Sequence, residues 1–216
     1  MRTFNPIVGC LHGCTYCYAR KWARRQRHRC FKCFEFTPHI HEERLERRFR
    51  KGMIFLCDMA DWMGDWVSME WRRKVTEMMR ESPDATFLSL TKNPKNYRGI
   101  ISILPENVIL GTTIETDIAY PQISRAPAPH QRLNAFRAIK WPRKMVSIEP
   151  IMIFTPRLAQ LIKKTEPEFV YVGYDNYGHS LPEPSLKETR LLIDELSEFT
   201  EVRVKTLREA ASSADV

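Results

Sequence analysis

The sequence predicts an α/β fold in which parallel strands form an open or partial (β/α)6-type TIM barrel, with a seventh strand near the C-terminus. Short, nearly continuous apolar runs alternate along the chain with segments of helical periodicity, a pattern typical of parallel strands covered by helices. The chain has 216 residues, fewer than the roughly 250 that a closed eight-unit barrel typically needs. We therefore expect a barrel that is not closed.

The expected strands are short apolar or β-branched runs bounded by polar residues. They are 4–8, 53–57, 85–90, 108–114, 145–148, 169–172 and 202–205. The expected helices carry apolar residues at three- and four-residue spacing. They are 19–27, 65–81, 95–103, 130–139, 156–164 and 186–199. The segment 29–51 fits neither pattern and is interpreted as an insertion or irregular crossover. We expect one domain over 1–207 and a tail over 208–216.

The first expected strand ends at a cluster of cysteines. Cys10, Cys14 and Cys17 have the spacing C-x3-C-x2-C, with Tyr16 before the last of them. Three is an odd number, and the spans are too short for relaxed disulfides. Three thiolates can instead hold a four-iron cluster and leave one iron open. Structural zinc is the alternative, but zinc prefers four protein ligands, so the spacing favours a [4Fe-4S] cluster.

Polar or charged residues follow the other expected strands directly. Because the loops at the carboxyl ends of parallel strands converge, these side chains are expected to form one pocket. Any one of them could instead be a helix cap or a solvated turn, and Asp61 and Asp175 are the first candidates for that. The residues concerned are Cys57, Asp58, Asp61, Lys92, Thr113, Glu115, Glu149 and Asp175.

Cys10, Cys14, Tyr16 and Cys17 together spell C-x3-C-x-aromatic-C, and in this the chain resembles the radical S-adenosylmethionine (radical SAM) enzymes. Further stretches resemble a small phage- and prokaryote-encoded branch of unassigned function that is labelled by its three-cysteine motif. These stretches are 5–10, 17–19, 41–45, 90–94 and 147–150. The resemblance covers about 4–174 and implies a partial barrel with the cluster loop after the first strand.

The resemblance also implies the chemistry. The open iron would chelate S-adenosylmethionine, and electron transfer from the cluster would cleave it to methionine and a 5′-deoxyadenosyl radical. That radical would abstract hydrogen from an unidentified substrate. An electron donor for the cluster is therefore an expected partner. Whether S-adenosylmethionine is consumed or regenerated, and the oligomeric state, stay open.

The residues expected to hold the cofactor have separate roles. Glu115 is placed to accept hydrogen bonds from ribose hydroxyls, and Lys92 to meet a carboxylate or an anionic substrate. Tyr16 is expected near the adenine. One of the acidic side chains would face the amino group and the sulfonium. The full expected set is Tyr16, Asp58, Asp61, Lys92, Thr113, Glu115, Glu149 and Asp175.

The segment 57–61 departs from the family pattern. Many radical SAM enzymes carry Gly-Gly-Glu after the second strand, and this chain has Cys-Asp-Met-Ala-Asp there instead. How the amino group of the cofactor is held is therefore open. The Cys57 thiol is a candidate donor of a hydrogen atom to a substrate radical. The alternative is that it packs as a small apolar side chain, which is at least as common for a buried cysteine.

A second metal is a further expectation for the segment 29–51. Cys30 and Cys33 form a C-x2-C pair, and His39 and His41 follow closely. Zinc is the commonest ion for such a set, while an auxiliary cluster or a disulfide are alternatives. The spacing of the histidines is tighter than usual for zinc.

The net charge of +8 lies entirely in residues 20–51, which hold 12 Lys/Arg and 4 Asp/Glu, while charges cancel in the rest. Such a segment attracts an anion, and nucleic acid is the expected partner, with a solvated helix face as the alternative. No apolar run approaches the roughly 18 residues of a membrane span. Six cysteines without an export signal indicate a reducing cytoplasm.

A binding module is the competing class of protein. In that interpretation a zinc- or cluster-stabilised basic domain grips nucleic acid or a protein partner without chemistry. A brown, iron-containing protein would favour the enzyme, and a colourless, zinc-containing one the module.

Overall fold

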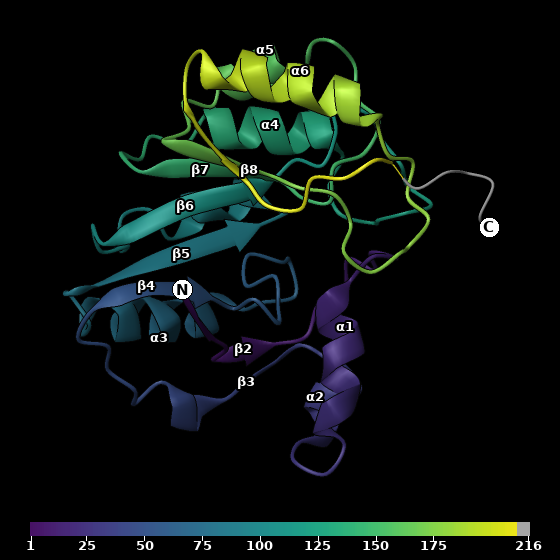
Figure 1. The fold of residues 1–216 in the computed structure, drawn as a ribbon. Coiled ribbons are helices and arrows are strands. Elements are labelled where there is room, and N and C mark those ends of the chain that lie inside the picture. Colours follow the sequence, from purple (N-terminus) through teal and green to yellow (C-terminus); the bar gives the residue numbers. More distant parts are fainter. Residues whose placement is uncertain (211–216) are drawn as a thin grey trace.

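The computed structural model describes residues 1–210 and has at its centre a seven-stranded parallel sheet that curls into a half barrel (Figure 1). The strand order β1-β4-β5-β6-β7-β8-β9 follows the chain without a reversal. This confirms the predicted partial barrel. The strands are β1 (Arg2–Phe4), β4 (Gly52–Leu56), β5 (Ala85–Thr91), β6 (Val108–Thr113), β7 (Lys144–Ile148), β8 (Phe169–Val172) and β9 (Glu201–Val204).

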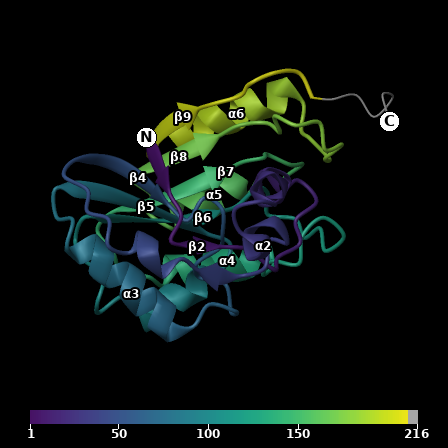
Figure 2. The same cartoon turned by 90° about the horizontal axis from the view of Figure 1, so that it is seen from below.

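Helices connect the strands and cover the outer side of the sheet. They are α3 (Met69–Arg80), α4 (Pro129–Arg137), α5 (Leu158–Lys163) and α6 (Leu186–Ser197). In the view from below, the strands fan out between α3 and α6 (Figure 2). The expected helix 65–81 begins later because the Ser68 side chain caps it, and the expected helix 95–103 is the 3-10 helix η3 (Pro94–Gly99). Among the helices of residues 1–210, none is long and apolar enough to cross a bilayer.

Both faces of the sheet are apolar, which explains the nearly continuous runs in the sequence. Alternate residues such as Phe87 and Val170 pack against the helices in the main core. The residues between them, including Leu88 and Phe169, form a second and smaller cluster. Most of the charged groups near the sheet are therefore at the ends of the strands, while Ser89 inside β5 is buried with its hydroxyl bonded to Trp62 and Tyr97.

The N-terminal segment differs from the expected single strand over 4–8. The chain leaves the main sheet after Phe4, and β2 (Ile7–Val8) pairs antiparallel with β3 (His39–Ile40) instead. Pro6 has no N–H to donate to a ladder, and the side chain of Asn5 turns to Asp58. The cysteine loop consequently follows β2, one step away from the main sheet.

The segment after the cysteine loop is more regular than expected. It contains α1 (Tyr18–Ala23), η1 (Arg24–Gln26), α2 (Phe31–Phe34), β3 and η2 (Glu42–Arg44). Within the expected helix 19–27, Ala19 and Ala23 are buried, whereas Trp22 is 42% exposed. Tyr18 also faces the body of the protein, because its hydroxyl donates to the backbone oxygen of Asp58. Figure 1 shows α1 and α2 beside the carboxyl ends of the strands.

The predicted tail 208–216 lies partly outside the described residues, because the description ends at residue 210. Its first residue is held in place. The Arg208 guanidinium forms an ion pair with Glu183 at 2.7 Å and donates to the carbonyl oxygen of Asp175 at 2.8 Å.

Candidate active site

A cavity of about 410 Å³ lies at the carboxyl ends of the strands, against the cysteine loop. It is lined by residues from the cysteine loop and from the ends of six strands, β4 to β9. Residues after five of these strands were predicted to meet here, and Lys205 after β9 was not. Of the residues predicted for the cluster and cofactor site, Glu115 is the one that does not line this cavity. The predicted residues on the wall are Cys10, Cys14, Tyr16, Cys17, Cys57, Asp58, Asp61, Lys92, Thr113, Glu149 and Asp175.

Two glycines allow the cysteine loop to turn tightly. Gly9 has φ +96°, and a Cβ there would collide with the backbone of Thr37 and Pro38. Gly13 has φ +63°, and a Cβ would stand 2.9 Å from Nη2 of Arg125. These are left-handed conformations that glycine adopts without strain. The loop is therefore closely confined on both sides.

All three thiols of the loop are free and partly exposed. Cys14 Sγ lies 3.0 Å from Ser124 Oγ, and Cys17 Sγ accepts a hydrogen bond from the Arg20 amide at the start of α1. Burial raises the pKa of Cys10 and Cys17 and so favours their protonated thiols. A metal that bound them would displace these protons. Three unbridged thiols on one cavity wall are a donor set that fits a four-iron cluster with one open iron.

Asp61 joins the cysteine loop to the ends of β4 and β5. Its buried carboxylate accepts hydrogen bonds from His12 Nε2 at 2.8 Å, Thr91 Oγ1 at 2.6 Å and the Lys92 amide at 2.8 Å. Burial alone raises the pKa of Asp61, but the bonds from His12, Thr91 and Lys92 outweigh it and hold the pKa below its ordinary value. Asp61 is thus an organising anion and not the solvated turn that was its alternative interpretation.

Glu115 makes a second link between the cysteine loop and the sheet. One oxygen accepts from Tyr16 Oη at 2.5 Å and pairs with the Lys92 ammonium, and the other pairs with Arg132 at 2.7 Å. Lys92 Nζ also donates to Tyr16 Oη at 2.7 Å. Glu115 is only 1% exposed. Both of its oxygens are occupied, so its predicted contact with a ribose would require an exchange of partners.

Asp58 and Cys57 follow β4 on the same wall. Asp58 accepts a hydrogen bond from Asn5 Nδ2 at 2.5 Å, and Tyr18 Oη donates to its backbone oxygen at 2.9 Å. Burial raises the pKa of Asp58, although the bond from Asn5 opposes this. The Cys57 thiol is nearly inaccessible from outside, and burial raises its pKa. Cys57 is therefore a protonated thiol at the cavity wall.

The opposite wall carries the ends of β7, β8 and β9. Glu149 Oε2 accepts from Ser147 Oγ at 3.1 Å and lies 3.2 Å from the Lys205 ammonium. Asp175 accepts from the backbone amide and the ring of His179, at 2.7 and 2.9 Å. Asp175 therefore holds its own loop, whereas Glu149 has only partial pairing and faces the cavity.

The second predicted metal set is also assembled. Cys30, Cys33, His39 and His41 place one ligand atom each within 4.8 Å of one another. None of the four is among the residues on the cavity wall. The structure thus holds two separate groups of cysteines.

Several residues that organise the site were not predicted as site residues. Asn5 belongs to the stretch 5–10, which resembles the three-cysteine branch, and this resemblance was the only sequence feature that could have indicated a role for Asn5. His12 lies between Cys10 and Cys14 in the sequence, but its partner Asp61 is 49 positions away. Arg132 lies within an ordinary helical pattern and becomes visible only through its buried contact with Glu115.

Comparison with known proteins gives a family and a fold. A family model described as "Protein of unknown function (DUF5131)" matches residues 1–173, and the chain belongs to this family. No curated protein matches the chain.

Solved structures similar to this chain include forms of spore photoproduct lyase. A mutant with dinucleoside spore photoproduct has a TM-score of 0.61 at 13% identity, and another form complexed with the same dinucleoside has 0.59 at 11%. Each comparison covers 93% of this chain and 62% of the other. This chain therefore spans less than two thirds of those structures, and at this identity the likeness establishes the fold.

The role of Asp61 is tested by removing its charge. We expect Asp61→Asn to lower the free energy of unfolding by about 1–3 kcal/mol, because the carboxylate accepts from four donors, the Met63 amide included. The single acceptor oxygen of an amide leaves some of these buried donors unsatisfied. Urea denaturation measures the change. The matched control is Asp84→Asn, since Asp84 is exposed and is expected to change stability by less than about 0.5 kcal/mol. Equal effects of the two substitutions would contradict the assignment.

Proposed function

We propose that this chain is a radical SAM enzyme, with one [4Fe-4S] cluster on Cys10, Cys14 and Cys17, and that it belongs to the branch labelled by the three-cysteine motif. One observation carries the proposal: three unbridged thiols line the same cavity as the polar ends of six parallel strands. The fold supports it, because spore photoproduct lyase, which has the same fold, is a radical SAM enzyme.

When bound, the cluster supplies the electron that cleaves S-adenosylmethionine to methionine and a 5′-deoxyadenosyl radical. The residues of this chain bind and orient. Asp58 and Glu149 offer carboxylates to the amino group and the sulfonium, and both line the cavity. Lys92 offers a cation to the cofactor carboxylate or to an anionic substrate. Thr113 and Asp175 complete the wall around the cofactor.

Tyr16 and Glu115 act together in this proposal. Tyr16 lines the cavity, and Glu115 and Lys92 hold it through its hydroxyl. Its ring is therefore fixed in one position, beside the proposed site of the adenine. Glu115 orients Tyr16 and Lys92 from behind the wall. The apolar packing of Tyr16 against Met152 and Leu181 excludes water from this side, which protects a reactive radical.

Cys57 is proposed as the hydrogen donor that quenches a substrate radical. It is a protonated thiol on the wall of the same cavity, and its S–H bond would break as the substrate C–H bond forms. The thiyl radical left on Cys57 would then be returned to the thiol by one electron from the reductant that serves the cluster and one proton from solvent. If so, Cys57→Ala would still form 5′-deoxyadenosine but would fail to return hydrogen to the substrate. Unimpaired product formation by this variant would remove Cys57 from the reaction.

Nucleic acid is the proposed substrate class. The cations between Arg20 and Lys32 are unpaired, since among residues 1–210 none of them lies within 4.0 Å of a carboxylate. The Arg25 guanidinium stacks over the ring of exposed Trp22 at 3.7 Å, and Phe31 is 70% exposed. Exposed aromatic rings among cations suit the stacking of unpaired bases. A form of spore photoproduct lyase with the same fold is complexed with a dinucleoside.

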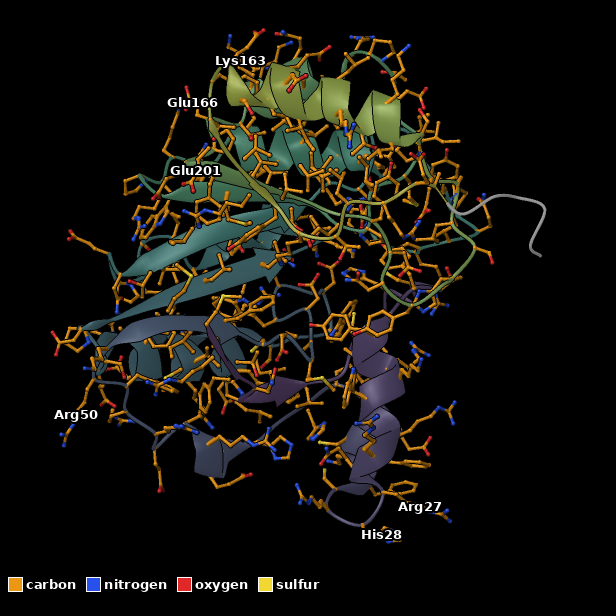
Figure 3. The ribbon with its side chains drawn as sticks, viewed as in Figure 1. Arg27, His28, Arg50, Lys163, Glu166 and Glu201 are labelled. Carbon is orange, nitrogen blue, oxygen red and sulfur yellow. The ribbon has the colours of Figure 1, made fainter. Side chains whose placement is uncertain are left out.

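The basic segment 20–51 is not one continuous surface. Arg27 and His28 lie at the turn between α1 and α2, whereas Arg50 lies across the molecule from them (Figure 3). Arg48 pairs with Glu81, and Arg44 donates to the backbone of Asn5. We therefore assign the nucleic-acid surface to α1, η1 and α2, which begin directly after Cys17.

Cluster loss is the test of the central assignment. Cys14→Ala removes one of three iron ligands, so the purified protein should hold little iron and sulfide and form no 5′-deoxyadenosine from S-adenosylmethionine under reducing conditions. Cys57→Ala is the control for iron content, because Cys57 is not a ligand in this proposal. A Cys14→Ala protein with full iron and sulfide would overturn the assignment. A colourless wild-type protein that holds zinc alone would favour the non-catalytic binding module.

The nucleic-acid surface is tested by binding over a salt series. The wild-type protein should bind single-stranded oligonucleotide with an affinity that falls steeply with salt. Arg24→Glu combined with Arg25→Glu should reduce the slope of log affinity against log salt by roughly one to two units, since fewer phosphates are neutralised. Arg50→Glu is the matched control and should leave the slope nearly unchanged. Absence of salt-dependent binding by the wild type, to single-stranded and duplex oligonucleotides alike, would leave a small molecule or a peptide as substrate.

A further inference from the structure

The group of Cys30, Cys33, His39 and His41 lies outside the cavity and has no part in the proposed reaction. Its ligand atoms converge on one point. His39 Nε2 is 3.0 Å from His41 Nε2, and Cys33 Sγ is 3.2 Å from His41 Nε2 and 3.5 Å from His39 Nε2. Cys30 Sγ is also 3.5 Å from His39 Nε2. Zinc bonds of about 2.0–2.3 Å in tetrahedral geometry separate neighbouring ligand atoms by roughly 3.3–3.8 Å, close to these values.

The hydrogen bonds behind the histidines fix which ring nitrogens carry protons. His39 Nδ1 lies 2.7 Å from the carbonyl oxygen of Thr37, and His41 Nδ1 lies 2.9 Å from a carboxylate oxygen of Glu43. Both of these partners can only accept, so both Nδ1 atoms are the donors. In the neutral rings the two Nε2 atoms therefore present lone pairs to each other. Two lone pairs at 3.0 Å repel unless a cation lies between them.

The same contacts are those that support histidine ligands in metal sites. A ligating histidine almost always donates its other N–H to a carboxylate or a backbone carbonyl, and here each histidine does one of these. Cys30 caps α2 with its side chain, accepting from the Cys33 amide at 3.4 Å. Two ligands thus come from α2 and its N-cap, and two from β3 and the residue that follows it. Four residues separate Cys33 from Pro38, in the turn that joins α2 to β3.

The position of this group connects it to the cysteine loop. His39 pairs with Val8, and the His41 amide donates to the Pro6 carbonyl at 2.7 Å, so both histidines are tied to β2. The Thr37–Pro38 backbone lies so close to Gly9 that a Cβ there would collide with it. Gly9 directly precedes Cys10. The segment that the group holds together is therefore the segment against which the cysteine loop is built.

We propose that Cys30, Cys33, His39 and His41 bind one structural zinc ion, which fixes β3 and the Thr37–Pro38 turn against β2 and Gly9. A disulfide between Cys30 and Cys33 is an alternative that would leave the histidines without a cation. The zinc ion would hold this turn against Gly9, so that the neighbouring Cys10 is positioned to bind iron.

The test separates this site from the iron cluster. In a chain in which Cys10, Cys14 and Cys17 are all replaced by Ala, the only cysteines left are Cys30, Cys33 and Cys57. Metal analysis should find about one zinc per chain in this protein and also in the wild type, where iron is counted separately. Exchange of zinc for Co²⁺ should produce the intense visible absorption of tetrahedral cobalt with thiolate ligands. A failure of the cluster proposal would leave these results unchanged.

Substitutions then identify the ligands. His41→Ala should weaken zinc binding by more than about 100-fold in competition with a chromophoric chelator, because loss of a supporting residue alone costs about 10–100-fold. Glu43→Gln should fall within that smaller range. The matched controls are His28→Ala and Glu46→Gln, exposed residues of the same segment that should leave zinc affinity unchanged. Zinc affinity of His41→Ala equal to that of His28→Ala, or a wild-type chain that binds no zinc when zinc is supplied, would overturn the proposal.

Discussion

Two buried carboxylates hold the cysteine loop on the sheet, and the arrangement of the site depends on them. Asp61 joins His12 of the loop to the ends of β4 and β5, and Glu115 joins Tyr16 of the loop to the end of β6. A buried carboxylate is tolerated only when its oxygens are fully paired, and loss of one partner from such a pair costs about 3–5 kcal/mol. The loop is thereby anchored between each pair of neighbouring cysteines, at His12 and at Tyr16.

The loop is confined on its other side by backbone contacts. Gly9 meets the turn at Thr37 and Pro38, and β2 pairs with β3. The cysteine loop thus lies between a rigid sheet edge and a small segment that has its own proposed metal ion. Because other residues hold the cysteine loop in place, groups on the cavity wall such as Glu149 and Asp58 are only partly paired. Partly paired groups are those that can still bind a cofactor.

The strands and most of the cavity wall could be predicted because they depend on local pattern. Apolar runs mark β4 to β8, and the residues that follow them meet because parallel strands end at one edge. The break between β1 and β2, the exposure of Trp22 and the roles of His12 and Arg132 could not be predicted in this way. Three of these depend on a partner distant in sequence: Asn5 on Asp58, His12 on Asp61, and Arg132 on Glu115. Trp22 instead stacks with the nearby Arg25 on the surface. The residues next to a charged side chain in the sequence do not show which distant buried group it pairs with.

The most direct test of the central claim is electron paramagnetic resonance of the anaerobically reduced protein, with and without S-adenosylmethionine. The account predicts the signal of one reduced four-iron cluster per chain, because three cysteine ligands leave one iron open. It also predicts that the g values change when S-adenosylmethionine is added and occupies that iron. A protein without a cluster signal, or with a signal that S-adenosylmethionine does not alter, would contradict it.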